Sequence, residues 1–354
     1  MINIVTCICV DKDDKDESVY PRMNYRTSQQ RRLIYWKCAA VSFATSIRCN
    51  PGIRHILYTN DHTAVRYKGH DLRAFLTDLG VEIRYLPFEI FKPFPGVSKK
   101  FRNAFYKLDV ISELGKHENE YNVLLDSDCV WVKNSLSFFQ AIDHEKLLVY
   151  DCYQRTDPYE KRSGLNRMDL GEMFNRIDPA YPVAAPIHYG REIIGGNGRM
   201  FREISNQMHQ FFRHVLQTYG NDPPRFPNGN SIFDYEEYVT SFVYNKMPDR
   251  LIEAGDLIHR VAAPYQKNSL AAMNYTIWHL LAEKRLGFMF LFKKVFDLKS
   301  AFWKIPLDNL DEYISKHMGV SRRKSVIEKY LVRVYKAWYA AQFIVRRKLR
   351  KLSF

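Results

Sequence analysis

The first 150 residues alternate between short apolar runs and segments with helical spacing, and this alternation restricts the chain to few folds. In chain order these segments are a strand-like 2–10, a helical 28–47, a strand-like 53–60, a helical 64–79, a strand-like 81–88, a helical 101–114 and a strand-like 121–125. The pattern predicts an α/β fold, a doubly wound and mostly parallel sheet with helices on both faces. Such sheets bind ligands at the carboxyl ends of their strands, so a site is expected just after Val10, Tyr58 and Leu125.

Later parts of the chain are more irregular. Residues 156–186 and 221–230 are rich in Pro, Gly, Asn and charge, which is typical of loops over a site. A helical pattern over 201–216 lies between them.

Basic residues are concentrated at the C-terminal end. Residues 284–354 contain 18 Lys and Arg against 5 Asp and Glu, whereas residues 1–283 contain 35 against 34. We therefore expect a nearly neutral catalytic or binding domain, 1–283, followed by a basic amphipathic C-terminal helical region, 284–354.

Within that region, residues 321–352 have the pattern of one long helix with an apolar stripe and a basic run, 346–351, near its end. A basic amphipathic helix is typical of proteins that bind an anionic membrane surface. Two alternatives stay open. The stripe could pack on the body of the protein or on a second copy in a homo-oligomer, or the charge could bind nucleic acid, which is disfavoured because no nucleic-acid-binding motif accompanies it.

Cysteine usage and the apolar windows indicate the compartment. The 6 Cys include no CxxC pair and no His at zinc spacing, which predicts reduced thiols in a cytosolic protein. The apolar run 2–10 is too short and too β-branched for a signal peptide, and no window approaches the ~18 apolar residues of a membrane-spanning helix. We expect a cytoplasmic protein, peripherally associated with the cytosolic face of a membrane.

Two acids follow the fourth strand-like run. Asp126 and Asp128 are separated by one residue and come directly after the buried run 121–125. If the backbone bends there, both carboxylates can face the crevice at the sheet edge and hold one divalent cation that neutralises a diphosphate. A solvated turn with two acids is the alternative interpretation.

The run Leu124-Leu125-Asp126-Ser127-Asp128 resembles the DxD motif of metal-dependent glycosyltransferases of the GT-A fold, of the type that builds bacterial polysaccharide and lipopolysaccharide. The preceding run, 102–110, is similar to the helix before the DxD strand in many of these enzymes. The resemblance implies that Asp126 and Asp128 bind Mn²⁺ or Mg²⁺ on the donor diphosphate. It also implies that Lys107 and Arg102 lie near the donor, although a solvent-facing Lys107 is equally compatible with the helical pattern.

Two further features stand in the order that the resemblance implies. The glycine-rich run 193–198 is similar to the loop that borders the acceptor site, which points to Gly195 and Gly196. The run 234–242 opens a helix where these enzymes place a carboxylate near the acceptor hydroxyl or the donor sugar, which implies Glu237, with Glu236 next to it, as the catalytic acid. Asp234 and Glu237 also have the spacing of a capping box, so we assign Asp234 as the helix cap.

The neutral domain ends on a histidine that the same resemblance makes a third metal ligand. His279 is followed by Lys284 and Arg285, where the family places a basic residue on the diphosphate, and we favour Lys284. No KPW follows His279, and the glycine run lies unusually far beyond the DxD. These departures leave the subfamily, and with it retention or inversion at the anomeric centre, open.

The resemblance implies a transferase that moves a sugar from a nucleotide sugar, with UDP-sugars favoured, to a glycan or lipid-linked glycan in polysaccharide biosynthesis. Two other classes remain. Haloacid-dehalogenase-like phosphatases open with a similar motif, in which Asp126 would be the nucleophile and Asp128 the general acid, but they carry it on their first strand. A non-enzymatic basic adaptor that binds a membrane or nucleic acid is the third class.

Overall fold

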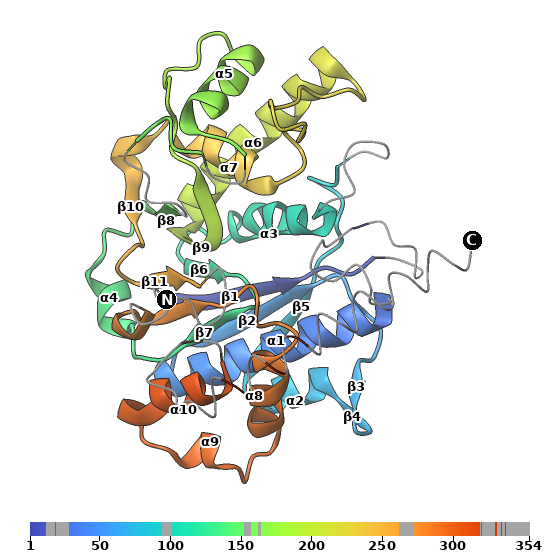
Figure 1. Ribbon diagram of the computed structural model, residues 1–354, viewed down its shortest axis with the longest axis vertical. Helices are drawn as coiled ribbons and strands as arrows, with labels where there is room; N and C mark the ends of the chain where they lie inside the picture. Colours follow the sequence, from blue (N-terminus) through green and yellow to red (C-terminus); the bar gives the residue numbers. More distant parts are fainter. Residues whose placement is uncertain are drawn as a thin grey trace.

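A computed structural model describes most of the chain (Figure 1). The described residues are 1–11, 18, 28–93, 101–151, 157–161, 164–261, 272–318, 320, 330, 334 and 337. The expected long helix at 321–352 therefore lies outside the described residues, apart from three positions, as does most of the loop that follows the first strand.

The molecule is built on a seven-stranded sheet with the strand order β10-β8-β9-β6-β1-β2-β5. The strands are β1 (Ile2–Ile8), β2 (Arg54–Thr59), β5 (Val81–Tyr85), β6 (Tyr121–Leu125), β8 (Leu147–Asp151), β9 (Tyr189–Asn197) and β10 (Leu251–Glu253). Strand β9 pairs antiparallel with both β6 and β8, and the other described pairings in this sheet are parallel. The expected α/β architecture, doubly wound and mostly parallel, is confirmed.

Helices cover both faces of the sheet (Figure 1). The longer helices are α1 (Ser28–Cys49), α2 (Leu72–Asp78), α3 (Tyr106–Leu114), α5 (Arg167–Ile177), α6 (Gly198–Tyr219), α7 (Glu236–Tyr244), α8 (Gly287–Phe296) and α10 (Leu310–His317). The shorter ones are α4 (Leu136–Ala141), α9 (Ala301–Lys304) and the 3-10 helices η2 (Arg102–Phe105), η3 (Pro248–Arg250) and η5 (Leu307–Asn309). Buried side chains from α1, α2 and α8 form one core, and those from α3, α5, α6 and α7 form a second.

A smaller sheet contains β7 (Cys129–Trp131), the strand that begins immediately after the two acids. Its order is β11 (Ile258–Arg260), β12 (Ile277–His279) and β7. Strand β12 runs antiparallel to β7, with His279 opposite Cys129, and the backbone N–H of Leu280 donates to the carbonyl of Asp128. This pairing brings the end of the neutral domain to the end of β6.

Three segments differ from the sequence-based expectation. Residues 64–79 begin with a hairpin, β3 (Arg66–Tyr67) and β4 (His70–Asp71), because Lys68 and Gly69 both have positive φ, and the helix starts only at Leu72. Residues 193–197 of the expected glycine loop belong to β9, a central strand, and Gly198 begins α6. The expected loop at 156–186 contains the helix α5, which was not predicted. Asn166 and Asp169 form a capping box at its start, and their spacing in the sequence is that of such a box.

The first part of the basic region packs on the body of the molecule. Helix α8 buries Phe288, Leu291, Phe292 and Val295 in the core that α1 forms. The boundary expected at residue 283 stays a prediction. No helix in the described part of the chain is long and apolar enough to cross a bilayer.

Candidate active site

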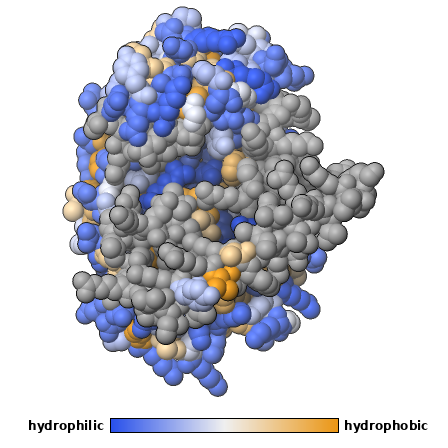
Figure 2. All heavy atoms as spheres, viewed as in Figure 1, coloured by the Kyte–Doolittle hydropathy of each residue, from blue (hydrophilic) through white to orange (hydrophobic). Residues whose placement is uncertain are grey.

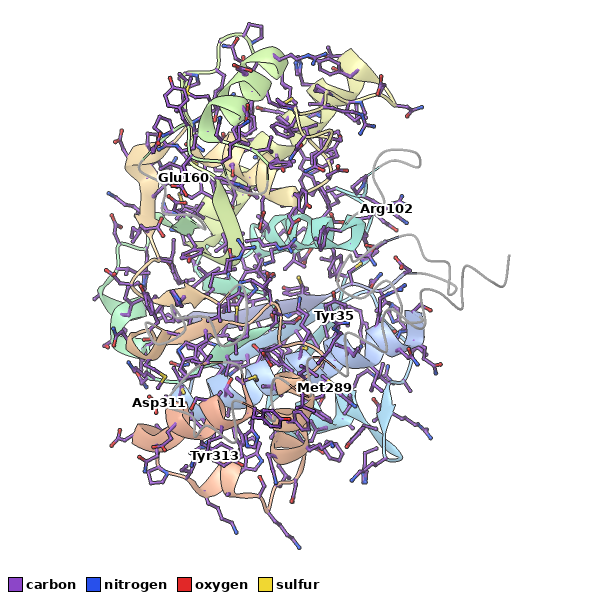
Figure 3. All side chains as sticks on the ribbon, viewed as in Figure 1. Tyr35, Arg102, Glu160, Met289, Asp311 and Tyr313 are labelled. Carbon is purple, nitrogen blue, oxygen red and sulfur yellow. The ribbon has the colours of Figure 1, made fainter. Side chains whose placement is uncertain are left out.

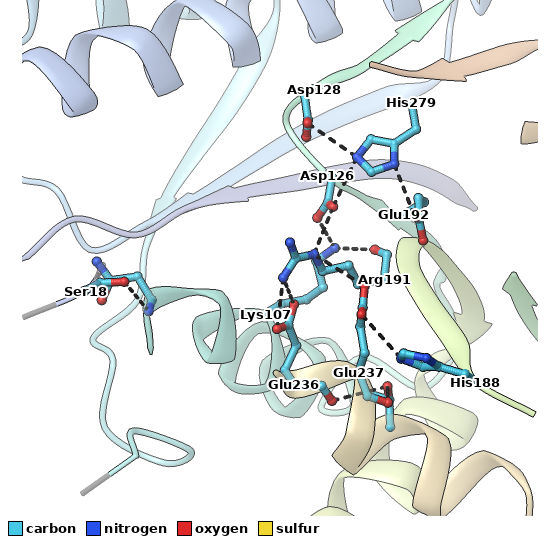
Figure 4. A network of polar contacts seen from close by, with 12 residues as sticks. Ser18, Lys107, Asp126, Asp128, His188, Arg191, Glu192, Glu236, Glu237 and His279 are labelled. Carbon is cyan, nitrogen blue, oxygen red and sulfur yellow. Dashed lines mark hydrogen bonds and ion pairs between the residues drawn. The ribbon is translucent and has the colours of Figure 1, made fainter. Parts of the chain in front are cut away.

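Three potential metal ligands converge at the carboxyl end of β6 (Figure 4). Asp126 and Asp128 follow the strand, and His279 Nε2 lies 3.6 Å from Asp126 Oδ2 and 3.4 Å from Asp128 Oδ2. One ligand atom from each of these residues falls within 4.8 Å of the other two. Two carboxylate oxygens and an imidazole nitrogen are a donor set that suits Mn²⁺, so these residues fit a divalent cation.

Local structure explains why both acids face the same space. The residues between β6 and β7 form a tight turn, in which the backbone N–H of Cys129 donates to the carbonyl of Asp126. The carboxylates of Asp126 and Asp128 lie on the same side of this turn. Asp128 is 1% exposed, so a solvated turn is excluded for this acid. His279 is 3% exposed and reaches the pair through the β7–β12 pairing.

Cations surround the two acids. Lys107, in the first turn of α3, places its Nζ 2.5 Å from Asp126 Oδ1 and 2.6 Å from the carbonyl oxygen of Arg191. Lys284 Nζ lies 2.9 Å from Asp128 Oδ2, and Arg191 Nε lies 3.5 Å from Asp126 Oδ2. Lys107 is 4% exposed, so it does not face solvent, which was the alternative for its helical position.

A second acidic pair lies across the cavity, at the start of α7. Arg191 joins it to the first pair, because its Nη1 donates to Glu236 Oε1 at 2.9 Å while its Nε lies 3.8 Å from Glu237 Oε1. Glu237 Oε2 also lies 3.4 Å from His188 Nε2. Both glutamates are buried, at 1% and 6% exposure.

The expected capping box at this helix is absent. The N-cap of α7 is Tyr235, which makes no side-chain cap hydrogen bond, and Asp234 Oδ2 accepts from the backbone N–H of Ser231 instead. The assignment of Asp234 as the cap was therefore wrong. Because the helix starts one residue later than a cap at Asp234 requires, Glu237 is free of the capping role and lines the cavity.

Burial and neighbouring charges set the ionisation of these groups. Burial opposes ionisation of Asp128, but Lys284 and His279 outweigh it and hold the pKa of this carboxyl well below its usual range. Burial likewise opposes a charge on His279, but Asp128 and Glu192 raise its pKa to about 9. Burial raises the pKa of Glu236 against the effect of Arg191.

Glu237 behaves differently from its neighbour. Burial opposes its charge, but the hydrogen bond with His188 and the charge of Arg191 lower the pKa of Glu237 to about 2. Its Oε1 accepts no hydrogen bond within the described part of the chain. The side chain is therefore an ionised carboxylate in the wall of the cavity.

These residues line a cavity of about 390 Å³, within the size range of small-molecule sites. Other lining residues come from the carboxyl end of β1, from α1 and from the start of α7, including Cys7, Cys9, Tyr35 and Tyr235. Figure 2 shows the molecule hollowed near its centre, where hydrophilic residues line the hollow.

Three of the expected site residues lie elsewhere. Arg102 donates to the carbonyl of Pro93 at 2.8 Å and does not line the cavity (Figure 3). Gly195 and Gly196 pair with Val123 and Asn122 inside the sheet, away from the carboxyl end of β6. A Cβ at Gly195 would lie 3.0 Å from Leu148 Cβ, so close packing of the sheet explains that glycine.

Sequence analysis did not anticipate four residues of the site, namely Arg191, Glu192, His188 and Arg260. Arg191 and Arg260 line the cavity, and Glu192 lies directly behind His279. The charged pair at 191–192 within an apolar run was the only visible signal, because a strand buried on both faces rarely carries such residues.

No family model matches the chain, and no curated protein matches it. Among solved structures, the chain is similar to mouse xyloside xylosyltransferase 1 in its apo form, with 8% sequence identity and a TM-score of 0.44. This similarity covers 78% of the present chain and 96% of that chain.

Proposed function

We propose that the protein is a metal-dependent glycosyltransferase that moves a sugar from a nucleotide-sugar donor, with UDP-sugars favoured, to a glycan or glycolipid acceptor. The convergence of Asp126, Asp128 and His279 in a cavity that also contains basic side chains carries this proposal. Mn²⁺ or Mg²⁺ bound by the three residues would supply positive charge to the departing diphosphate.

The basic side chains of the cavity suit an anionic donor. Lys107 pairs with Asp126 and Lys284 pairs with Asp128, so each lysine neutralises one of the two acids. When a cation shares the charge of these acids, both ammonium groups can turn part of their hydrogen bonding toward phosphate oxygens. Arg191 and Arg260 add two guanidinium groups to the lining of the cavity, so several cationic side chains are present to bind a diphosphate.

The acids at the start of α7 suit the sugar-transfer step. Glu237 is ionised and lines the cavity, so it can accept a proton from an acceptor hydroxyl or stabilise positive charge that develops on the sugar. Glu236 is held by Arg191, which makes it the weaker candidate for proton transfer and the better candidate for orienting that arginine.

The setting of this activity is proposed from charge. The net charge of residues 284–354 suits contact with anionic lipid headgroups, and this contact would place the enzyme on the cytosolic face of a membrane, next to a lipid-linked acceptor. Flotation of the full-length protein with anionic vesicles at low salt tests this part. A protein that stays in solution at low salt refutes it.

The decisive experiment is a thermal-shift panel with UDP-, GDP-, CMP- and dTDP-sugars, each with and without Mn²⁺. We expect one nucleotide class to stabilise the wild-type protein only when Mn²⁺ is present, and Asp128→Asn to abolish that shift. Asp143→Asn, at an exposed acid outside the cavity, is the matched control and should keep it. If no nucleotide sugar stabilises the wild type in the presence of metal, the proposal fails.

The same protein preparation discriminates the two alternative classes. A haloacid-dehalogenase-like phosphatase would hydrolyse p-nitrophenyl phosphate with Mg²⁺ and lose this activity on Asp126→Asn. A non-enzymatic adaptor would keep its cellular function in Asp128→Asn but lose it when residues 321–354 are deleted.

A further inference from the structure

Glu192 is the most deeply buried charged side chain at the site. It is 0% exposed, and its Oε1 lies 3.2 Å from His279 Nδ1 and 3.0 Å from Arg260 Nε. Its Oε2 has no hydrogen-bond partner among the described residues. A buried carboxylate with one unsatisfied oxygen costs folding free energy, so its presence calls for a physical explanation.

The position of Glu192 in β9 supplies that explanation. Successive residues of a strand project to opposite sides, so Arg191 and Glu192 contact different residues of the site. Arg191 contacts Glu236 and Asp126, whereas Glu192 faces the small sheet that carries His279 (Figure 4). The backbone carbonyl of Glu192 also accepts the N–H of Asp126. One residue therefore touches two of the three potential metal ligands.

The contact with His279 determines which ring nitrogen can bind a cation. A carboxylate beside Nδ1 requires a proton on Nδ1, which leaves the Nε2 lone pair for a metal when the ring is neutral. Nε2 is the atom that faces Asp126 and Asp128. The carboxylate thus fixes both the tautomer and the orientation of the ring.

We infer that Glu192 is a positioning residue that fixes His279 as the nitrogen ligand of the divalent cation, and that it orients Arg260 toward the same cavity. This inference rests on the proposed function, because it requires the cation. Arg260 reaches Glu192 through strand pairing, since Arg260 lies opposite His279 in the β11–β12 register. Removal of Glu192 would therefore disturb a metal ligand and a cavity cation together.

The test compares the Mn²⁺ affinity of full-length wild type, Glu192→Gln and Glu120→Gln by calorimetric titration with MnCl₂ alone. Gln has the shape of Glu but lacks its charge. The side-chain NH₂ of Gln can take the position of Oε2, the oxygen that has no hydrogen-bond partner among the described residues. We expect Glu192→Gln to bind Mn²⁺ about 10- to 100-fold more weakly than wild type. Glu120→Gln is the control. Glu120 is half-buried, immediately precedes the first residue of β6, and accepts hydrogen bonds from Asn3 and Arg54. This substitution should change the Mn²⁺ affinity by less than about twofold.

A spectroscopic readout separates positioning from a merely structural role. In pulsed EPR, Mn²⁺ bound to the wild type should show hyperfine coupling to an imidazole nitrogen, and this coupling should be lost or weakened in Glu192→Gln. If Glu192→Gln does not fold, Glu192→Asp replaces it. This variant keeps the charge but shortens the side chain. We expect its Mn²⁺ affinity and its nitrogen coupling to lie between those of wild type and those expected for Glu192→Gln.

The outcomes are distinguishable. If wild type does not bind Mn²⁺, the metal-dependent function itself fails. If wild type binds Mn²⁺ with a nitrogen coupling and the folded Glu192 variant retains both affinity and coupling, the positioning role is refuted while the proposed function stands.

Discussion

Substitution of Lys107 by Met tests whether the acid at the end of β6 depends on a buried countercharge. Lys107 Nζ lies 2.5 Å from Asp126 Oδ1, and an effective dielectric constant of ~20 gives a Coulomb energy of about 7 kcal/mol at this distance. Desolvation of both groups offsets much of that energy, and breaking a buried pair usually costs about 3–5 kcal/mol. Arg191 remains 3.5 Å from the other carboxylate oxygen, so Asp126 keeps one cationic neighbour. We therefore expect a loss near the lower end, about 3 kcal/mol.

Urea unfolding without metal measures this loss, and Lys116→Met is the matched control. Lys116 lies two residues beyond the end of α3, is 68% exposed in its side chain and pairs with Glu113 across one turn. Exposed pairs contribute about 0.2–1 kcal/mol, so the control should lose less than about 1 kcal/mol. The two substitutions remove the same atoms, and their difference isolates the buried contact.

Added Mn²⁺ extends the test to the site. In the wild type, a bound cation would share Asp126 with the Lys107 ammonium, whereas in Lys107→Met it would replace the missing charge. Saturating Mn²⁺ should therefore raise the stability of Lys107→Met more than that of wild type. The reasoning is refuted if Lys107→Met is as stable as Lys116→Met in the absence of metal, or if Mn²⁺ stabilises wild type more than the variant.

Three further predictions concern the active-site acid, the stability of the fold as pH changes, and a close backbone contact. Glu237→Gln should lower sugar transfer by about 10²–10⁴-fold and leave Mn²⁺ affinity unchanged, because this side chain faces the cavity without touching the three ligands; equal turnover in Glu236→Gln and Glu237→Gln would contradict this. Burial lowers the pKa of His55 from 6.5 to about 4. As pH falls, His55 is protonated in the unfolded chain before it is protonated in the folded protein, so up to about 3 kcal/mol of stability is lost between pH 6.5 and 4. Urea unfolding at a series of pH values should show that the free energy of unfolding falls more steeply with pH in wild type than in His55→Asn. Equal slopes would refute this prediction. A Cβ at Gly171 would lie 1.8 Å from the carbonyl oxygen of Ala184, so Gly171→Ala should cost about 3 kcal/mol in the same assay. Gly52→Ala, with φ of 81° and no atom within 4 Å, should cost only about 1 kcal/mol, and a similar loss in both would show that the close contact does not matter.

Some elements of the site could be predicted from the sequence, because the pattern that indicates them lies in the same segment as the element itself. The run 121–125 is a central strand with five buried residues, and the two acids that follow it stand at its carboxyl end. Lys107 falls in the first turn of α3, as the helical pattern before that strand indicated. Local periodicity fixed these positions without knowledge of distant contacts.

Glycines were interpreted less well, because a glycine in a sequence has several structural uses. Gly195 and Gly196 lie in a strand, where neighbouring strands leave little room for a Cβ. Nothing local distinguishes this use from a flexible loop at a ligand site. The same ambiguity affected Asp234, whose spacing to Glu237 matches a capping box although the helix begins at Glu236.

Local sequence patterns specify the alternation of strands and helices, the acidic turn after β6 and the concentration of positive charge beyond residue 284, because each depends on neighbouring residues alone. The distant side chains that meet these acids depend on the tertiary fold. The β7–β12 pairing places His279 beside the two acids. Because β9 runs antiparallel to β6, Arg191 and Glu192 lie at the carboxyl end of β6. Helix α7 packs on β9, and this packing places Glu236 and Glu237 across the cavity from the acids. Such contacts arise from strand register and core packing between segments far apart in the chain, which no local pattern specifies.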